Sequence, residues 1–390
     1  LIGRSKPIFT DDIEENVNFL NATVSSSSFL VIGAAGSIGQ AVTKEIFKRN
    51  PKLLHCVDIS ENNLVELVRD IRSSLGYASG EFKTFAIDAG SNEFESLFHF
   101  QQGYDYVLNL SALKHVRSEK DPFTIARMMQ VNIFNTVKIA DLASRYGAKK
   151  YFCVSTDKAA NPMNMMGGSK RIMELYLNDL GEKLDISMAR FANVAFSDGS
   201  LLYGFQNRIK KLQPIAAPND IKRYFLSHQE AGELCLLSCL LGENRDIFFP
   251  KLSEQLHLST FADIASKYLH SLGYEPFLCD SEDEARSKID LLVKQKKWPC
   301  YFAPSDTTGE KDVEEFFTDN EQLDLDALHD IGIVKNTHQA NKDVLIKFRN
   351  EFNKIIGSKN ISKKSLLALY YICLPDFLHE EKKKFLDDKM

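Results

Sequence analysis

The sequence predicts an α/β protein built on a doubly wound parallel sheet, and three observations support this fold class. Short apolar runs typical of buried strands alternate with amphipathic stretches typical of helices over residues 28–191. A glycine-rich turn joins the first apolar run to the first amphipathic stretch. The chain has 390 residues, which favours a second lobe beside the first. Such alternation indicates βαβ units, whose parallel sheet is covered by helices on both faces.

The predicted elements follow one another in a regular order. An N-terminal arm, 1–27, contains one amphipathic helix at about 11–20 and precedes the first strand. The predicted strands are short apolar runs, at 29–33, 53–58, 82–87, 106–110, 151–154 and 186–191. Helical stretches separate them, so we expect a dinucleotide-binding domain of the Rossmann type over 28–190.

Beyond residue 190 the pattern changes twice. The mixed α/β region at 191–335 is predicted to form a smaller, substrate-binding lobe. Within it, an apolar helix at 229–241 is expected to pack back on the first domain. Residues 336–390 are charged and helical in pattern and carry no chemical motif. They are predicted to form a helical C-terminal extension.

The composition argues against several classes of protein. With 26% charged residues and a net charge of −5, the chain is not expected to bind nucleic acid or an anionic membrane. The nine histidines show no metal-ligand spacing, so no metal site is predicted. The seven cysteines form no C-x-x-C pair, which is typical of a reducing compartment. A polar N-terminus and the lack of a long apolar stretch predict a cytoplasmic protein without a transmembrane segment.

The glycine-rich turn, GAAGSIG, predicts a dinucleotide site. Gly33 would allow the tight turn, Gly36 would let the backbone approach a pyrophosphate, and Gly39 would let helix and strand pack closely. Ser37 and Ile38 begin the helix that follows. Free N–H groups and the positive end of the helix dipole favour phosphate at that point.

Two aspartates at strand ends predict which dinucleotide binds. Asp58 ends the second predicted strand, where a carboxylate accepts hydrogen bonds from the adenosine ribose and repels a 2′-phosphate. Residues 59–61 contain no arginine that would bind such a phosphate, so NAD is favoured over NADP. Asp88 ends the third strand and is the expected partner of the adenine amino group. The alternative for both is an aspartate that only forms a turn.

Reactive side chains follow the fifth predicted strand. Thr156, Asp157 and Lys158 lie at its carboxyl end, and such ends face the ligand crevice of a parallel sheet. Lys170 lies on the next helix. In isolation, Asp157 and Lys158 would be interpreted as an exposed ion pair. Because they follow a dinucleotide motif in the same sheet, we expect them to be catalytic.

Several motifs together resemble those of the nucleotide-sugar 4,6-dehydratases, extended members of the short-chain dehydrogenase/reductase family that act in capsule and glycan biosynthesis. The likeness covers about residues 28–320. It rests on STDKA at 155–159, NP at 161–162, SKR at 169–171, LKHV at 113–116, RFANVAFSDGS at 190–200, RYF at 223–225 and GEK at 309–311.

One position departs from the usual pattern of short-chain dehydrogenases. These enzymes carry a tyrosine four residues before the lysine, where this chain has Met166 before Lys170. Methionine cannot exchange a proton. A branch of the dehydratases that includes those making bacillosamine precursors also has methionine there, so the resemblance is to that branch. It favours retention of configuration at C5 and argues against an ordinary ketoreductase or 4-epimerase.

The resemblance implies a reaction and a role for each catalytic residue. UDP-N-acetylglucosamine would be oxidised at C4 by NAD, lose water across C5 and C6, and receive the hydride back at C6. Lys158 would be the base at C5, and Asp157 the acid that protonates the C6 hydroxyl. Thr156 would bond the C4 oxygen, and Lys170 the nicotinamide ribose. Without the tyrosine, the C4 proton would leave through Thr156, a water or a ribose hydroxyl.

The same resemblance implies substrate contacts and a partner. The residues predicted to contact the UDP-sugar are Lys114, Asn193, Ser200, Arg223 and Lys311. Relatives associate through helices that match 122–146 and 164–180, so at least a homodimer is expected. Two alternatives remain open. One is a nucleotide-sugar epimerase with the same NAD site, and the other is a non-catalytic dinucleotide-binding regulator.

Overall fold

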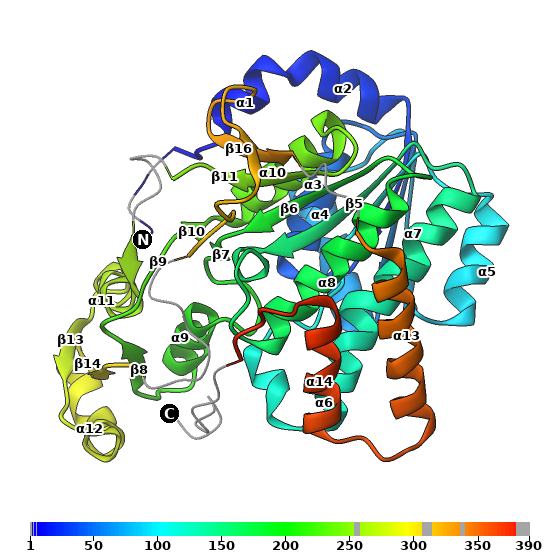
Figure 1. Cartoon of the computed structure of the whole chain (residues 1–390). Coiled ribbons are helices and arrows are strands. Elements are labelled where there is room, and N and C mark those ends of the chain that lie inside the picture. The colour runs from blue at the N-terminus through cyan, green and yellow to red at the C-terminus, as the bar shows by residue number, and fades with distance from the viewer. Residues whose placement is uncertain are drawn as a thin grey trace.

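A computed structural model describes residues 2, 4, 6–252, 258–305, 314–335 and 340–379 of the chain. Its centre is a nine-stranded sheet with helices on both faces (Figure 1). The strands of this sheet, in chain order, are β1 (Ser28–Ile32), β2 (Leu53–Asp58), β3 (Glu81–Ala86), β4 (Tyr106–Asn109), β5 (Lys150–Thr156), β6 (Ile186–Phe191), β11 (Asp246–Pro250), β15 (Gln322–Asp324) and β16 (Ile331–Lys335).

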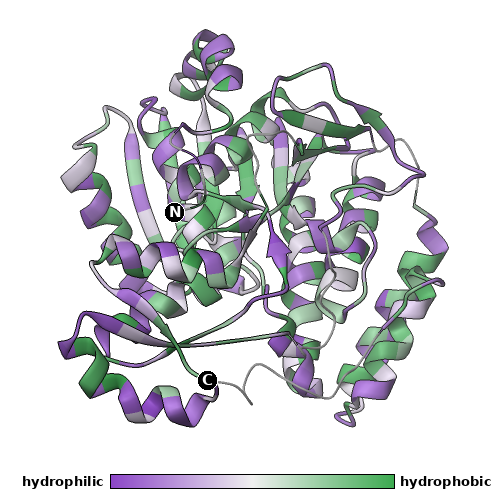
Figure 2. Ribbon diagram, turned by 90° about the vertical axis from the view of Figure 1, so that its left-hand side faces the viewer, coloured by the Kyte–Doolittle hydropathy of each residue, from purple (hydrophilic) through white to green (hydrophobic). Residues whose placement is uncertain are grey.

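The predicted doubly wound sheet is confirmed. Its spatial order is β15-β16-β11-β6-β5-β4-β1-β2-β3, and all pairs from β3 to β11 are parallel. The core order 3-2-1-4-5-6 is that of a Rossmann sheet. Most residues of the central strands are buried, and Figure 2 shows hydrophobic residues along them. The order reverses between β1 and β4, so the ligand crevice lies at the carboxyl ends of these strands.

The helices between the strands cover both faces of the sheet. They are α3 (Ser37–Phe47), α4 (Glu61–Ser74), α5 (Asn92–Gln101), α6 (Pro122–Met129), α7 (Thr136–Arg145), α8 (Met165–Leu180) and α10 (His228–Leu241). A π-helical turn, η2 (Gln130–Asn135), joins α6 to α7. Helix α10 packs closely on α3, because a Cβ on Gly232 would lie 2.8 Å from the backbone of Ala41. Among the described helices, none is long and apolar enough to cross a membrane.

A smaller lobe stands beside the main sheet (Figure 1). Its elements are β8 (Ile215–Pro218), β13 (Glu275–Leu278), β14 (Lys297–Ala303), α9 (Leu201–Lys210), α11 (Phe261–Ser271) and α12 (Glu282–Lys294). The strands form a parallel sheet in the order β13-β14-β8. Trp298 is buried in its core, and the indole Nε1 donates to the carbonyl of Gln213 at 3.0 Å. Two short strand pairs, β7 (Asn193–Val194) with β10 (Phe225–Leu226) and β9 (Lys222–Arg223) with β12 (Ser259–Thr260), connect this lobe to the crevice.

The main sheet takes in more of the chain than the sequence predicted. Strands β11, β15 and β16 come from the range 191–335, which was assigned to the second lobe. β11 extends β6 in parallel, and β16 and β15 then add antiparallel strands at that edge. These strands are short and are separated from β6 by the small lobe, so the regular strand–helix pattern does not reveal them.

The N-terminal arm forms two helices rather than the single one predicted. These are α1 (Thr10–Glu15) and α2 (Val17–Ser25), separated at Asn16. The buried carboxylate of Asp12 accepts hydrogen bonds from the backbone N–H groups of His329 and Asp330, at 2.6 and 3.0 Å. The arm is thereby attached to the segment that leads into β16.

The C-terminal helices α13 (Lys342–Gly357) and α14 (Lys363–Cys373) pack on α6, η2 and α8 (Figure 1). The rings of Phe134 and Phe352 lie 4.5 Å apart between centroids, and the Tyr176 hydroxyl donates to the Leu345 carbonyl at 2.6 Å. A Cβ on Gly168 would lie 2.8 Å from the ring of Tyr370. This extension therefore covers part of the helical surface, 122–146 and 164–180, that was expected to face a second copy.

Candidate active site

The predicted phosphate-binding turn begins at the end of β1. Gly33 has a φ of +73°, and a Cβ there would lie 2.8 Å from the Ser111 nitrogen. At Gly39 a Cβ would lie 2.0 Å from the Gly33 carbonyl oxygen, so this glycine lets α3 pack on the turn. At Gly36 a Cβ would be 3.5 Å from that same oxygen, an ordinary contact. Internal packing therefore explains the first and third glycines, whereas Gly36 keeps space in front of the helix.

The start of α3 also meets the second half of the chain. Ser37 is the first residue of the helix, and its hydroxyl accepts a hydrogen bond from the backbone N–H of Asp198 at 2.8 Å. Ile38 is half-buried and packs against the main core. The loop that carries Asp198 belongs to the motif at 190–200. The phosphate-binding turn and this motif therefore border one crevice.

A cleft of about 220 Å³ lies at the carboxyl ends of β1, β2 and β3, and Gly33, Gly36, Asp58 and Asp88 are among its lining residues. The Asp58 carboxylate accepts from the backbone N–H groups of Ala35 and Ser60, at 3.0 and 2.9 Å. It therefore ties the phosphate-binding turn to the end of β2. The cleft, the space at Gly36 and the carboxylate of Asp58 fit the adenosine and phosphates of a dinucleotide.

Asp88 has a partner that the sequence did not predict. Its carboxylate accepts from the Gly90 N–H at 2.7 Å and pairs with the Arg127 guanidinium at 3.1 Å. Burial opposes ionisation, but these hydrogen bonds and the Arg127 charge lower the pKa of Asp88. Arg127 lies on α6 and also lines the cleft. Because Arg127 is 39 residues from Asp88, only the fold shows that they meet.

The predicted catalytic segment lies at the carboxyl end of β5. The Thr156 hydroxyl donates to Asp157 Oδ1 at 2.6 Å, and Lys158 Nζ lies 3.1 Å from both carboxylate oxygens. The Asp157 side chain is 5% exposed and that of Lys158 is 29% exposed. A largely buried carboxyl group thus contacts a hydroxyl and an amine that still reaches solvent. The structure brings together the three residues that the sequence predicted as catalytic.

Lys170 and Met166 lie on α8, next to this segment. Lys170 is buried and donates to the Val154 carbonyl at 2.8 Å. Burial lowers the pKa of its ammonium group, although Cys153 and Glu174 oppose this effect. Met166 is also buried, and its backbone N–H donates to Glu119 Oε1 at 2.9 Å. The side chain at the usual tyrosine position is therefore an apolar contact without a proton to exchange.

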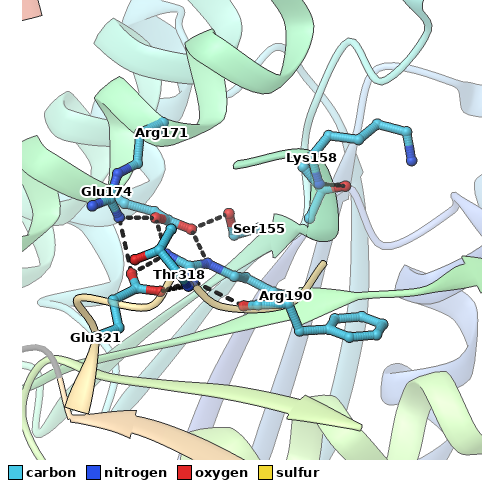
Figure 3. A network of polar contacts seen from close by, with 9 residues as sticks. Ser155, Lys158, Arg171, Glu174, Arg190, Thr318 and Glu321 are labelled. Carbon is cyan, nitrogen blue, oxygen red and sulfur yellow. Dashed lines mark hydrogen bonds and ion pairs between the residues drawn. The ribbon is translucent and has the colours of Figure 1, made fainter. Parts of the chain in front are cut away.

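A buried ionic network lies beneath the catalytic segment (Figure 3). Arg190, on β6, bonds the Glu174 carboxylate of α8 at 2.8 and 3.0 Å and both oxygens of Glu321 at 2.7 Å. Ser155 donates to Glu174 at 2.6 Å. In Figure 3 the side chain of Lys158 points away from this network. The network therefore supports the end of β5 through Ser155, and the Lys158 amine is not part of it.

The charges of the network act on one another. Burial opposes ionisation of Glu174, but the guanidinium groups of Arg190 and Arg171 lower the pKa of Glu174 to about 2. The same carboxylates raise the pKa of Arg190 despite its burial. Sequence analysis named Arg190 only as part of a motif and did not identify Glu174. A signal was available, since Glu174 follows Lys170 by four residues and so lies on the same face of the helix.

On the substrate side, the structure brings together two predicted residues and one that was missed. Asn193 Nδ2 donates to Glu314 Oε1, and the Tyr224 backbone N–H donates to Glu314 Oε2 at 2.7 Å. The neighbouring Arg223 is buried, and its Nη1 donates to the Lys222 carbonyl at 2.8 Å. Burial and then the nearby Asp157 carboxylate raise the pKa of Glu314 to about 8, against the opposing charges of Lys158 and Arg223.

Three further residues were predicted to contact the substrate, and the structure describes two of them. Burial lowers the pKa of the Lys114 amine, and the negative charge of Asp198 opposes this effect. Lys114 therefore lies close to the loop that carries Asp198. Ser200 caps α9, because its hydroxyl accepts the Tyr203 N–H at 3.1 Å. A substrate contact of Ser200 stays a prediction. Lys311 lies outside the described residues.

Comparison with known proteins places the chain in a family. The family described as polysaccharide biosynthesis protein matches residues 29–336. The chain belongs to this family. An uncharacterized membrane protein of Methanocaldococcus jannaschii is 30% identical over 88% of this chain and 96% of its own length.

Two further likenesses bear on the fold and the family. The capsular polysaccharide biosynthesis protein CapD of Staphylococcus aureus is 30% identical over 70% of this chain, which spans 44% of that protein. Among solved structures, that of Pen from Bacillus thuringiensis matches with a TM-score of 0.65. It is 21% identical, and the match covers 87% of this chain and 99% of Pen. This last likeness concerns the fold.

Proposed function

We propose that this member of the polysaccharide biosynthesis protein family removes water from a UDP-N-acetylhexosamine, UDP-N-acetylglucosamine, to give the UDP-4-keto-6-deoxy sugar. The observation that carries the proposal is the contact of Thr156, Asp157 and Lys158 at the carboxyl end of β5, the same edge of the sheet that carries the phosphate-binding turn. A dehydration needs an acid and a base that act on adjacent carbons. A neighbouring carboxyl group and amine can supply both.

The cofactor of this proposal is NAD. Gly36 and the free N–H groups at the start of α3 would hold its pyrophosphate, and Asp58 would bond its adenosine ribose. Asp88, which also lines the cleft, would face the adenine. Lys170 would use the donors that Val154 leaves free to bond the nicotinamide ribose. Bound NAD supplies the hydride acceptor for C4 and the hydride donor for C6.

Because Asp157 and Lys158 are in contact, the transfer of one proton between them converts one protonation form of the pair into another. An ionised carboxylate beside an ammonium group carries the same number of protons as a carboxylic acid beside a neutral amine. In the second form, the Lys158 amine takes the C5 proton while Asp157 gives its proton to the C6 hydroxyl, which leaves as water. The pair then stands as carboxylate and ammonium. As C6 receives its hydride, the Lys158 ammonium would return its proton to C5, and the proton released from the C4 hydroxyl would restore the carboxylic acid of Asp157.

The residues around this pair would place the sugar. The Thr156 hydroxyl, which contacts Asp157, would bond the C4 oxygen. Lys114 and Arg223 would provide positive charge for the diphosphate, and Asn193 would add an amide hydrogen bond. The C4 proton would leave through Thr156, a water or a ribose hydroxyl, because the buried Met166 side chain cannot accept it.

A nucleotide-sugar epimerase of the same fold is the second candidate, and one observation separates the two. An epimerase needs a proton carrier at C4 but has no use for the contact between Asp157 and Lys158. At C4, the tyrosine position is filled by Met166. The geometry therefore favours dehydration. A regulator that only binds a dinucleotide would have no use for the contact between Asp157 and Lys158.

The test is incubation of the purified protein with UDP-N-acetylglucosamine and NAD, followed by mass spectrometry of the nucleotide sugar. Loss of one water without accumulation of NADH is the expected result. An unchanged mass with conversion to the galacto isomer would establish the epimerase instead. If no nucleotide sugar is converted, the regulator becomes the better account.

A further inference from the structure

Glu314 is the buried carboxyl group next to the catalytic pair to which no role has yet been given. It is 4% exposed and follows the segment 306–313 in the chain. The chain that follows it is fixed by a hydrogen bond and by packing. Two residues later, the Phe316 carbonyl accepts from Arg190 Nη1 at 2.8 Å, and the ring of Phe316 packs on Phe249 in the core. The carboxyl group of Glu314 is therefore held at the crevice by the same arginine that supports β5.

The hydrogen bonds of Glu314 join two substrate-side strands. Its Oε1 atom accepts from Asn193 on β7, and its Oε2 atom accepts from the Tyr224 N–H at 2.7 Å, between β9 and β10. Tyr224 follows the buried Arg223 directly. One side chain thus sets the spacing between the amide and the guanidinium group that would meet the UDP-sugar.

We propose that Glu314 is a positioning residue that fixes Asn193 and the Arg223–Tyr224 backbone beside the Asp157–Lys158 pair, and that it does so as an uncharged carboxylic acid. This inference rests on the proposed function, in which Asp157 and Lys158 are the acid and the base of the dehydration. The groups that face Glu314 are Asp157 and Lys158 from the end of β5, Arg223 and the backbone of Tyr224 from the β9–β10 segment, and Asn193 from β7. The Tyr224 phenol is also close enough to respond to the charge of Glu314.

An uncharged acid satisfies this environment better than a carboxylate does. It keeps one oxygen as the acceptor for the Tyr224 N–H and offers its proton to the amide oxygen of Asn193, which can turn over because the two ends of an amide have the same shape. A second negative charge beside Asp157 would be unfavourable in a buried site. Above about pH 8, where Glu314 ionises, that charge would also repel the diphosphate of the substrate.

Substitution of Glu314 by glutamine should keep its hydrogen bonds, whereas substitution by alanine should remove them. Glu314→Gln keeps both the acceptor and the donor, without a charge. Glu314→Ala leaves the Asn193 amide and the Tyr224 N–H without their partner. Glu315→Gln is the matched control, because Glu315 is exposed and contacts Asn161 at 2.9 Å instead.

The experiment measures kcat and KM for dehydration of UDP-N-acetylglucosamine from about pH 6 to about pH 9 in the unsubstituted chain and these three variants. We expect kcat/KM of the wild type and of Glu315→Gln to fall about tenfold per pH unit above about pH 8. Glu314→Gln should match the wild type at pH 7 and lack this fall. Glu314→Ala should raise KM about tenfold at every pH. A wild-type alkaline fall in Glu314→Gln, or an unchanged KM in Glu314→Ala, would overturn the proposal.

Thermal unfolding separates a failure of this inference from a failure of the proposed function. A carboxyl group whose pKa is raised by folding loses its stabilising effect as pH rises from the unfolded value of about 4.5 to about 8. The Tm of Glu314→Gln should therefore rise relative to that of Glu315→Gln over this range. A constant difference would overturn the role of Glu314 even if the wild type dehydrates the substrate. A wild type without dehydration would reject the proposed function alone.

Discussion

Arg190 and Glu174 form a two-point ion pair at 2.8 and 3.0 Å in which both side chains are 0% exposed. The pair joins β6 to the helix that carries Lys170, directly beneath Ser155. Removing one partner would leave a buried charge that water cannot reach. The pair therefore ties the position of the predicted catalytic segment, Thr156 to Lys158, to the stability of the core.

We expect Glu174→Ala to lower the free energy of unfolding by about 3–5 kcal/mol. Urea denaturation followed by circular dichroism measures this change. Glu282→Ala is the control, because it removes a carboxylate from an exposed contact with Arg286 on α12 and should cost less than about 0.5 kcal/mol. Equal losses in the two variants would show that the buried pair contributes no more than a surface pair.

Lys158→Met should remove the C5 base and keep an unbranched side chain that is one atom shorter. We expect the dehydration rate to fall by at least about 100-fold. Lys158 does not line the adenosine cleft, so NAD affinity, measured by calorimetric titration, should stay within about twofold. The control is Lys288→Met on the exposed surface of α12, which should not change the rate. A Lys158→Met enzyme with undiminished turnover would remove this lysine from the mechanism.

Asp58→Asn tests the choice of NAD over NADP. The amide oxygen can keep one hydrogen bond of the phosphate-binding turn, but the charge that would repel a 2′-phosphate is lost. We expect the preference for NAD, taken as the ratio of the two dissociation constants, to fall at least about tenfold. Calorimetry with both dinucleotides gives this ratio. An unchanged ratio would mean that another group selects the cofactor.

The buried Glu233 on α10 should make stability depend on pH. Burial, and to a lesser degree Glu45 and Glu230, raise the pKa of Glu233 to about 7, against opposing effects of Gln229 and Lys48. Between about pH 4.5 and about pH 7 the unfolded chain releases this proton and the folded chain keeps it, so stability falls as pH rises. Glu233→Gln should therefore be more stable than the wild type by about 1–3 kcal/mol at pH 8 and equal to it at pH 4. The same gain at both pH values would contradict this origin.

From the packing of the C-terminal helices we expect a shortened chain to associate more strongly. A chain that ends at residue 339 would expose apolar side chains of α6, η2 and α8, among them Phe134 and Tyr176, which now contact α13. We expect this shortened chain to associate more strongly than the full chain in sedimentation experiments at equal concentration. If both chains show the same association state, α13 and α14 do not cover an adhesive surface.

The strands and helices of the first domain and the turn at Gly33 could be predicted because local rules determine them. Strand and helix periods, a tight turn and a carboxylate at the end of β2 are each visible within a few residues. The same holds for Thr156, Asp157 and Lys158, which are consecutive and lie at one strand end. These parts of the site follow from chain neighbours.

The partners that come from far along the chain could not be predicted in the same way. Glu314 meets Asn193 across 121 residues, and Arg190 meets Glu321 across 131. These carboxylates become buried only when the small lobe and the edge strands fold back on β6. Their neighbours in the sequence do not indicate this burial. Similarly, β11 covers the edge that β6 would otherwise leave unpaired, and β16 covers the edge of β11 in turn.

The central claim is that one hydride leaves C4 and returns to C6 of the same sugar while water is lost. The most direct test uses UDP-N-acetylglucosamine that carries deuterium at C4, with mass spectrometry and NMR of the product. We predict a product that has lost one water and keeps the deuterium, now at C6. A product of unchanged mass, or one that has lost water and carries no deuterium at C6, would contradict the proposed 4,6-dehydration.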